Sequence, residues 1–177
     1  TRLEPGAVNT SRFGLRGVED LGGGLKAGFH LESQINPDIG TAGAGAALFN
    51  RRSTVSLIGG WGELRLGRDY NPSSRNTYLF EPYIGTSFGT VLSFTLAPTA
   101  TLGSGVTTAL RTNNAVAYFT PSNLGGFYGE AMVAPSEGVA GNKSASARLG
   151  YAAGPFDVSY ALGTTKTATS DDFKQSN

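Results

Sequence analysis

Apolar and polar side chains alternate along most of this sequence. In the stretch 11–17, Arg12 and Arg16 fall on one side of an extended chain, and Phe13 and Leu15 fall on the other. The same period of two recurs further along, with turn-forming residues between the stretches. About eight strands are predicted, within residues 11–17, 24–33, 51–59, 62–67, 111–119, 126–134, 146–153 and 155–163. The fold class is therefore all-β and antiparallel.

The connections between these stretches come in two sizes. Short ones read EDLGGG, GGWG, SNLGG and AAGP, whereas NPDIGTAGAGAA and PSEGVAGNKSA are longer and the segment 69–110 is much the longest. That segment contains the aromatic residues Tyr78, Phe80, Tyr83, Phe88 and Phe94, which predicts that it folds onto the rest of the chain. Alternating short and long connections are typical of a transmembrane β-barrel with short turns at one end and long loops at the other.

Composition narrows the possible functions. The 26 glycines in 177 residues favour sheets and turns over helices, and a net charge of +1 argues against a nucleic-acid-binding surface. Because there is no cysteine and only one histidine, we expect no metal site, no cofactor and no enzymatic nucleophile–base pair. No run of 18 apolar residues is present, so no transmembrane helix is predicted.

The polar faces of the predicted strands carry arginines separated by small residues. A soluble sandwich would fill such faces with Lys, Glu and Thr, whereas spaced arginines suit side chains that project into a restricted space. The pattern therefore favours a barrel with a polar lumen and an apolar outer face. The alternative is a soluble all-β carbohydrate-binding module whose aromatic side chains stack on sugars.

Three segments carry a resemblance to a known family. They are TSRFGLRGVEDLGGGLKAGFHLES (10–33), LFNRRSTVSLIGGWGELRLGRDYNP (48–72) and RTNNAVAYFTPSNLGGFYGE (111–130). In this order and spacing they resemble the general diffusion porins of Gram-negative outer membranes, and more narrowly the anion-selective trimeric porins of beta-proteobacteria. Members of that family are about twice as long, so the resemblance implies that residues 1–177 are part of a single porin domain of a longer protein, without its first strand and about its last seven.

The resemblance implies a function as well as a fold. We expect a homotrimer of 16-stranded barrels in the cell outer membrane, in contact with membrane lipid and lipopolysaccharide. Each barrel would let small hydrophilic solutes diffuse passively, favouring anions such as small organic acids and inorganic phosphate, with no nucleic-acid partner. The segment 69–110 would be the third loop, folded inside to narrow the pore, with residues 79–90 near its tip.

The family also implies which residues form the constriction. The matching positions are Arg12 on the second strand, Glu32 on the third, Arg51 or Arg52 on the fourth, Arg111 on the sixth, and Glu81 near the loop tip. Alternation independently places Arg12 and Arg111 on polar faces. It favours Arg52 over Arg51, although a bulge in this strand would reverse that choice. For Arg65 and Arg68, a structural bridge into the long loop and a role in the pore are left as alternatives.

Overall fold

The computed structural model describes residues 10–43, 47–82, 110–136, 143–166 and 172–177. Its elements are ten strands and one helix. The strands are β1 (Arg12–Gly22), β2 (Leu25–Asn36), β3 (Thr41–Ala42), β4 (Arg52–Gly59), β5 (Gly62–Tyr70), β6 (Arg111–Phe119), β7 (Phe127–Ala134), β8 (Ser144–Ala153), β9 (Phe156–Thr165) and β10 (Phe173–Ser176); the helix is α1 (Pro72–Phe80).

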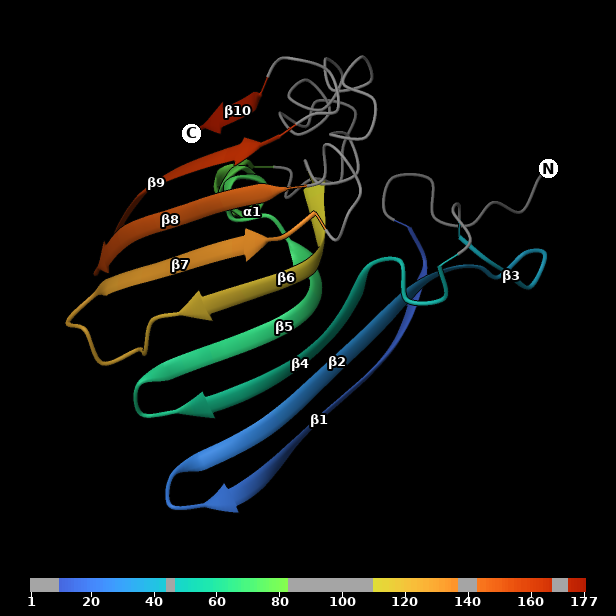
Figure 1. Cartoon of the computed structure of the whole chain (residues 1–177), viewed down its shortest axis with the longest axis horizontal. Coiled ribbons are helices and arrows are strands. Elements are labelled where there is room, and N and C mark those ends of the chain that lie inside the picture. The colour runs from blue at the N-terminus through green and yellow to red at the C-terminus, as the bar shows by residue number, and fades with distance from the viewer. Residues whose placement is uncertain (1–9, 44–46, 83–109, 137–142, 167–171) are drawn as a thin grey trace.

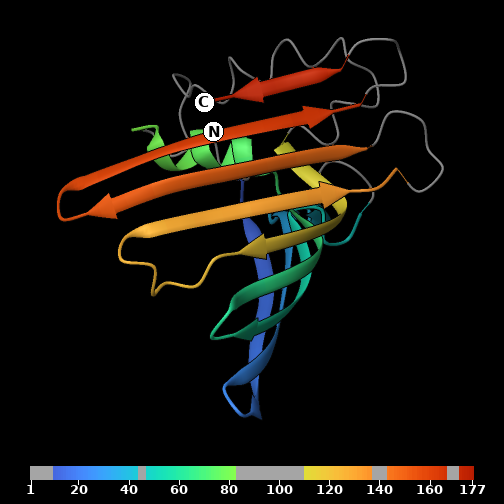
Figure 2. The ribbon, with the colours of Figure 1, turned by 60° about the vertical axis from the view of Figure 1, so that its left-hand side comes forward.

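All the strands form one antiparallel sheet in the order β1-β2-β4-β5-β6-β7-β8-β9-β10, with β3 paired to β2. The eight predicted strands are confirmed, and the short strands β3 and β10 are additional. The short connections gather at one end of the sheet and the longer ones leave from the other end, as the alternation of lengths predicts (Figure 1). The sheet is strongly twisted: β7 to β9 run across Figure 2, whereas β1 and β2 are seen nearly edge-on.

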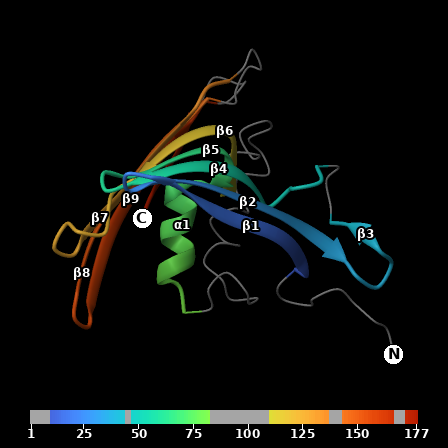
Figure 3. The ribbon, with the colours of Figure 1, turned by 90° about the horizontal axis from the view of Figure 1, so that it is seen from below.

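Helix α1 lies inside the curve of the sheet (Figure 3). It begins where the Asn71 side chain accepts a hydrogen bond from the Ser73 backbone N–H at 3.0 Å, and Pro72 occupies the first helical turn. The helix packs against β7, β8 and β9. Residues 72–80 of the long segment therefore pack against the sheet as expected, and they do so as a helix. Tyr83, Phe88 and Phe94 lie outside the described residues.

Strand register determines which side chains share a face. Arg16 is opposite His30, and His30 is opposite Thr54, so these three share one face. Asp69 and Glu130 both contact Arg75 of α1, which identifies the helix-bearing, concave face of the sheet. The convex face carries exposed apolar side chains from every long strand, among them Phe13, Leu15, Phe29, Val55, Leu57, Leu66, Val116, Tyr118, Val133, Leu149, Tyr151, Val158, Tyr160 and Leu162.

The buried apolar side chains are few and small within the described part of the chain. They are Ala115, Ala117, Met132, Ala134 and Ala161. A soluble sheet buries its large apolar face, but here that face is the exposed one. An apolar outer face with a polar inner face is the arrangement of a membrane barrel.

One β-bulge changes the alternation. Ala115 pairs with Gly67, but Thr112 pairs with Asp69, so β6 has an extra residue here, and Asn114 takes a positive φ of 52°. Thr112 therefore continues the concave-face row, and Arg111 pairs with Tyr70. The alternation argument for Arg111 is wrong across this bulge.

Candidate functional site

Arginine side chains gather on or beside the concave face, and each is held by specific partners. At the end of the sheet from which the longer connections leave, the charged groups belong to residues that the family resemblance indicates. Further arginines come from β5, β8 and α1, namely Arg65, Arg148 and Arg75.

Arg51 and Arg52 both point to this face. Arg51 lies just before β4, and its Nε donates to Glu32 Oε1 at 2.5 Å while its Nη1 donates to Thr10 Oγ1 at 2.8 Å. Arg52 begins β4 opposite Glu32, and its Nη2 lies 3.5 Å from Asp69 Oδ2. The sequence leaves these two arginines as alternatives, whereas in the structure both contact carboxylates of the concave face.

Arg111 reaches the same region despite the bulge. Its Nη2 donates to the Tyr70 hydroxyl at 2.6 Å, and its Cζ lies 4.4 Å from the centre of the Tyr70 ring. The guanidinium also interacts electrostatically with Arg51 and Glu32. Among the described residues, the side chain that accepts a hydrogen bond from Arg111 is thus a phenol and not a carboxylate.

Arg12 and Glu81 lie at different places. Arg12 is the first residue of β1, exposed and opposite Gln34, at the same end of the sheet as Glu32. Glu81 is buried and caps the end of α1, where its backbone N–H donates to the Thr77 carbonyl at 3.1 Å. Glu81 shares a pocket with Asp157 of β9, six strands along the sheet from β2. The structure therefore groups Arg12 with Glu32 but sets Glu81 apart, and residues 83–90 of the loop tip lie outside the described residues.

Asp69 is the centre of a cluster that sequence reasoning missed. Its side chain is only 2% exposed, and its Oδ2 contacts Arg65 at 2.5 Å, Arg75 at 3.1 Å and Arg52 at 3.5 Å. Arg75 also contacts Glu130 Oε2 at 3.1 Å. These contacts attach α1 to β5 and β7.

The sequence contained only part of the signal for this cluster. Glu63 and Arg65 share a parity on one predicted strand, but that prediction ended before Asp69, and Arg75 lies on a helix that the pattern did not indicate. Of the two alternatives for Arg65, the contacts favour the structural bridge, since its Nε also donates to Glu63 Oε1 at 2.8 Å. Arg68 donates to the Asn50 carbonyl at 2.7 Å and to Asn113 Oδ1 at 2.5 Å.

A second polar group surrounds Arg148 on β8. Its Nε donates to Asn76 Oδ1 at 2.9 Å, and its Cζ lies 4.7 Å from the centre of the Tyr128 ring. The Tyr128 hydroxyl donates to Asp157 Oδ1 at 2.6 Å. Together with the Asp69 cluster, this group holds α1 from two sides.

The chemistry that this face offers is electrostatic. Arginine does not lose its proton at physiological pH, and its planar fork of donors suits carboxylates and phosphates. No group of three or more His, Cys, Asp or Glu residues that could hold a metal ion is found among the described residues. None of the described helices is long and apolar enough to span a bilayer.

Comparisons with known proteins agree with this geometry. A family model described as Gram-negative porin matches residues 1–177. Over 173 residues, 94% of this chain and 48% of the relative, the sequence is 41% identical to outer membrane porin protein 32 of Delftia acidovorans. It is also 39% identical to an outer membrane porin protein of Bordetella pertussis over 127 residues, 70% of this chain and 30% of that protein.

Solved structures are similar too. The anion-selective porin from Comamonas acidovorans superposes with a TM-score of 0.80 at 40% identity, over 91% of this chain and 49% of that one. A loop L8 deletion mutant of the Vibrio cholerae outer membrane protein OmpT gives a TM-score of 0.63 at 18% identity, over 95% and 52%, which shows the fold alone. The chain thus spans about half the length of the first of these relatives and of both structures.

Proposed function

Because this chain belongs to the Gram-negative porin family of the outer membrane, we propose that the protein forms a water-filled channel for passive diffusion of small hydrophilic solutes. Its sheet corresponds to about half of a 16-stranded porin barrel. Family membership sets aside the soluble carbohydrate-binding module and assigns the protein to the non-enzymatic channels.

One observation carries the proposal. The same strands present exposed apolar side chains on the convex face and bonded charged groups on the concave face, as at Leu66 and Arg65 of β5. The convex apolar face is suited to contact with lipid, and the concave charged face is suited to contact with water. A closed barrel would also pair the backbone groups of the outer strands, which are costly to leave unpaired in lipid.

The arginines support a preference for anions. Arg12, Arg51, Arg52 and Arg111 lie toward one end of the sheet, where Glu32 and Asp69 compensate part of their charge. A guanidinium that bonds a phenol, as Arg111 does, keeps its full positive charge near the lumen. We propose that small organic acids and inorganic phosphate are the favoured solutes, in line with the name of the similar anion-selective porin from Comamonas acidovorans.

The segment 69–110 is proposed as the loop that narrows the pore. Support comes from α1, which opens this segment and stands inside the curve of the sheet (Figure 3). In this proposal Glu81 contributes a carboxylate near the narrow region, opposite the arginines of the wall.

We also propose that the whole protein is a homotrimer surrounded by membrane lipid and lipopolysaccharide. The convex apolar face supports contact with lipid acyl chains. One similar structure is described as the trimer form of a Vibrio cholerae outer membrane protein, at 17% identity and a TM-score of 0.57, a likeness that concerns the fold.

Liposome swelling tests the channel directly. Vesicles that contain the detergent-extracted protein should swell in isotonic solutions of small sugars and amino acids, at rates that fall steeply as the solute grows. Absence of swelling would refute the channel, and rates independent of solute size would refute the constriction by residues 69–110.

A further inference from the structure

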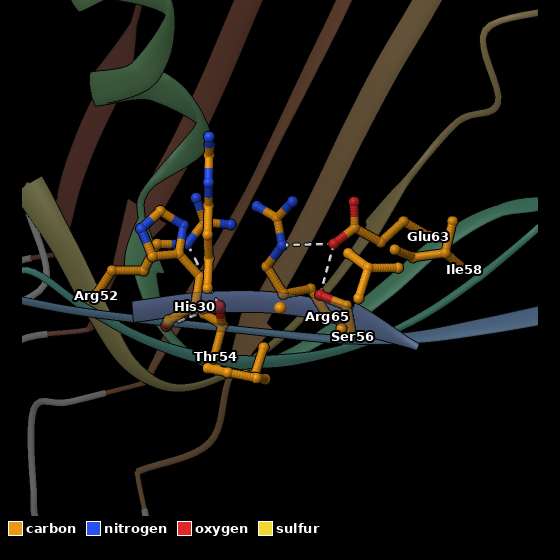
Figure 4. A pocket seen from close by; sticks show the side chains of 12 residues that line it. His30, Arg52, Thr54, Ser56, Ile58, Glu63 and Arg65 are labelled. Carbon is orange, nitrogen blue, oxygen red and sulfur yellow. Dashed lines mark hydrogen bonds and ion pairs between the residues drawn. The ribbon is translucent and has the colours of Figure 1, made fainter. Parts of the chain in front are cut away.

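A pocket of about 400 Å³ opens on the concave face between β1, β2, β4 and β5. Each of these four strands contributes one basic side chain: Arg16, His30, Arg52 and Arg65. Figure 4 shows His30 next to Arg52, and Arg65 held by Glu63. Arg16 lies four residues beyond Arg12 along β1, a distance of about 13 Å in a strand. The pocket therefore lies further along the strands than the group formed by Arg12, Glu32 and Arg111, and Arg52, opposite Glu32, borders both.

The four basic groups differ in how far their charge is neutralised. Arg65 is paired twice, with Glu63 at 2.8 Å and Asp69 at 2.5 Å. Arg52 lies 3.5 Å from Asp69, a carboxylate that it shares with two other arginines. Within the described ranges, neither the Arg16 guanidinium nor the His30 imidazole forms a hydrogen bond or an ion pair. Arg16, His30 and Arg52 can therefore donate to a ligand.

Part of the pocket lining is apolar, beside the polar side chains of Thr54, Ser56 and Glu63. Val18 and Ile58 flank Gly28, and a Cβ built on Gly28 would lie 3.7 Å from both of those side chains. The absence of a side chain at Gly28 leaves room for an alkyl group beside them. Basic side chains beside apolar ones match a small anion that has a carbon skeleton.

We propose that this pocket binds small organic carboxylates in transit and that protonation of His30 tightens the binding. The inference deepens the proposed function, because it adds a second anion site on the wall of the same channel. It also adds a dependence on pH that arginines alone cannot give, since histidine changes charge between about pH 5 and 8.

The surroundings of His30 explain the coupling. Charged groups surround it: Glu32 on its own strand β2, Arg16 and Arg52 on the neighbouring strands β1 and β4, and Asp69 on β5 beyond β4. Glu32 is bonded to Arg51, and Asp69 to three arginines, so the carboxylates are already engaged. A protonated imidazole between Arg16 and Arg52 adds positive charge that a bound carboxylate compensates. Proton and anion therefore bind cooperatively, and each increases the affinity for the other.

Lactate is a suitable probe, because its carboxylate stays ionised throughout this pH range and its methyl group can reach the side chains of Val18 and Ile58. Its affinity for the detergent-solubilised protein would be measured at about pH 5.5 and 7.5, alongside the imidazole resonance of His30 in histidine-labelled protein. The His30→Asn variant assigns that resonance by its loss. Arg16→Gln tests the pocket, and Lys26→Gln, which removes a charge from the same face of β2 outside the pocket, is the matched control.

We expect Arg16→Gln to weaken lactate binding about fivefold, and Lys26→Gln to change it less than twofold. His30→Asn should abolish the tightening at low pH, and lactate should increase the protonated fraction of His30 in the wild-type protein. Glycolate, which is lactate without its methyl group, should bind about fourfold more weakly than lactate.

Equal losses of lactate affinity in Arg16→Gln and Lys26→Gln would overturn the proposed binding pocket. They would indicate that lactate responds to the overall positive charge of this face and not to a specific site. If the His30 imidazole resonance did not change on addition of lactate, the proposed coupling between protonation and anion binding would be wrong. Liposome swelling by the wild-type protein is measured separately, so failure of the channel itself would be recognised independently.

Discussion

Arg75 Nη2 on α1 lies 3.1 Å from Asp69 Oδ2 at the end of β5, and this contact attaches the beginning of the long segment to the sheet. Asp69 is almost fully buried and is the common partner of three arginines. Partly burying three guanidiniums is costly unless a carboxylate compensates them. The stability of this part of the sheet therefore depends on one charged residue.

We predict that Asp69→Asn lowers the free energy of unfolding by about 3 kcal/mol, because it leaves three partly buried arginines undercompensated. Urea unfolding in lipid vesicles measures the effect. Asp172→Asn is the control, since Asp172 pairs with Lys166, which is 60% exposed, and its loss should cost less than about 1 kcal/mol. Equal losses in the two variants would contradict the role of Asp69.

Arg75→Gln should loosen the attachment of α1 to the sheet without removing any contact between two strands. We expect larger sugars to enter liposomes faster than with the wild-type protein, because the helix loses its ionic links to Asp69 and Glu130. Arg68→Gln is the matched control, since Arg68 bonds Asn50 and Asn113 and not α1. An unchanged size limit in Arg75→Gln would mean that this anchor does not set the width of the pore.

The two faces can be tested with two residues of nearly equal exposure. Leu149 on the convex face is 64% exposed, and Val18 on the concave face is 66% exposed. Leu149→Arg should destabilise the folded protein in a bilayer by about 2–4 kcal/mol, whereas Val18→Arg should be tolerated because water solvates the new charge. Equal destabilisation by the two arginines would refute the assignment of lipid and lumen faces.

Gly67 occupies a backbone position that side chains cannot take without strain. Its φ is +120°, and an added Cβ would come within 2.1 Å of the Ser53 carbonyl oxygen. We predict that Gly67→Ala costs about 1–3 kcal/mol or more in unfolding free energy. Gly60→Ala, at a turn with no heavy atom within 4 Å of the new Cβ, should cost much less. A similar loss in both variants would show that the strain at Gly67 is absent.

Alternation alone predicted most of the sheet, because period two is a direct consequence of strand geometry. It placed Phe13 and Leu15 on the outer face and Glu32 on the inner face. It failed at Arg111, where the bulge at Asn114 shifts the register by one residue, a change that no local pattern in β6 indicated.

The alternation of apolar and polar residues could not predict contacts between segments that are distant in the sequence. Arg75 meets Glu130 across 55 residues of sequence, and its helix carries small polar residues with no apolar stripe. The Asn71–Pro72 pair was the available signal for a helix start, but the aromatic content of the following segment suggested only that it would pack. Alternation favoured Arg52 over Arg51 because the predicted strand included both residues, whereas β4 begins at Arg52 and the alternation does not extend to Arg51.

The central claim is that arginines at the long-connection end of the sheet make the channel favour anions. Reversal potentials in a salt gradient test it, with Arg12→Ala combined with Arg111→Ala compared with a control that removes two exposed charges, Lys166→Ala combined with Lys174→Ala. We predict that the chloride-to-potassium permeability ratio falls about fivefold in the arginine variant and stays near the wild-type value in the control. An unchanged ratio in the arginine variant would contradict the account.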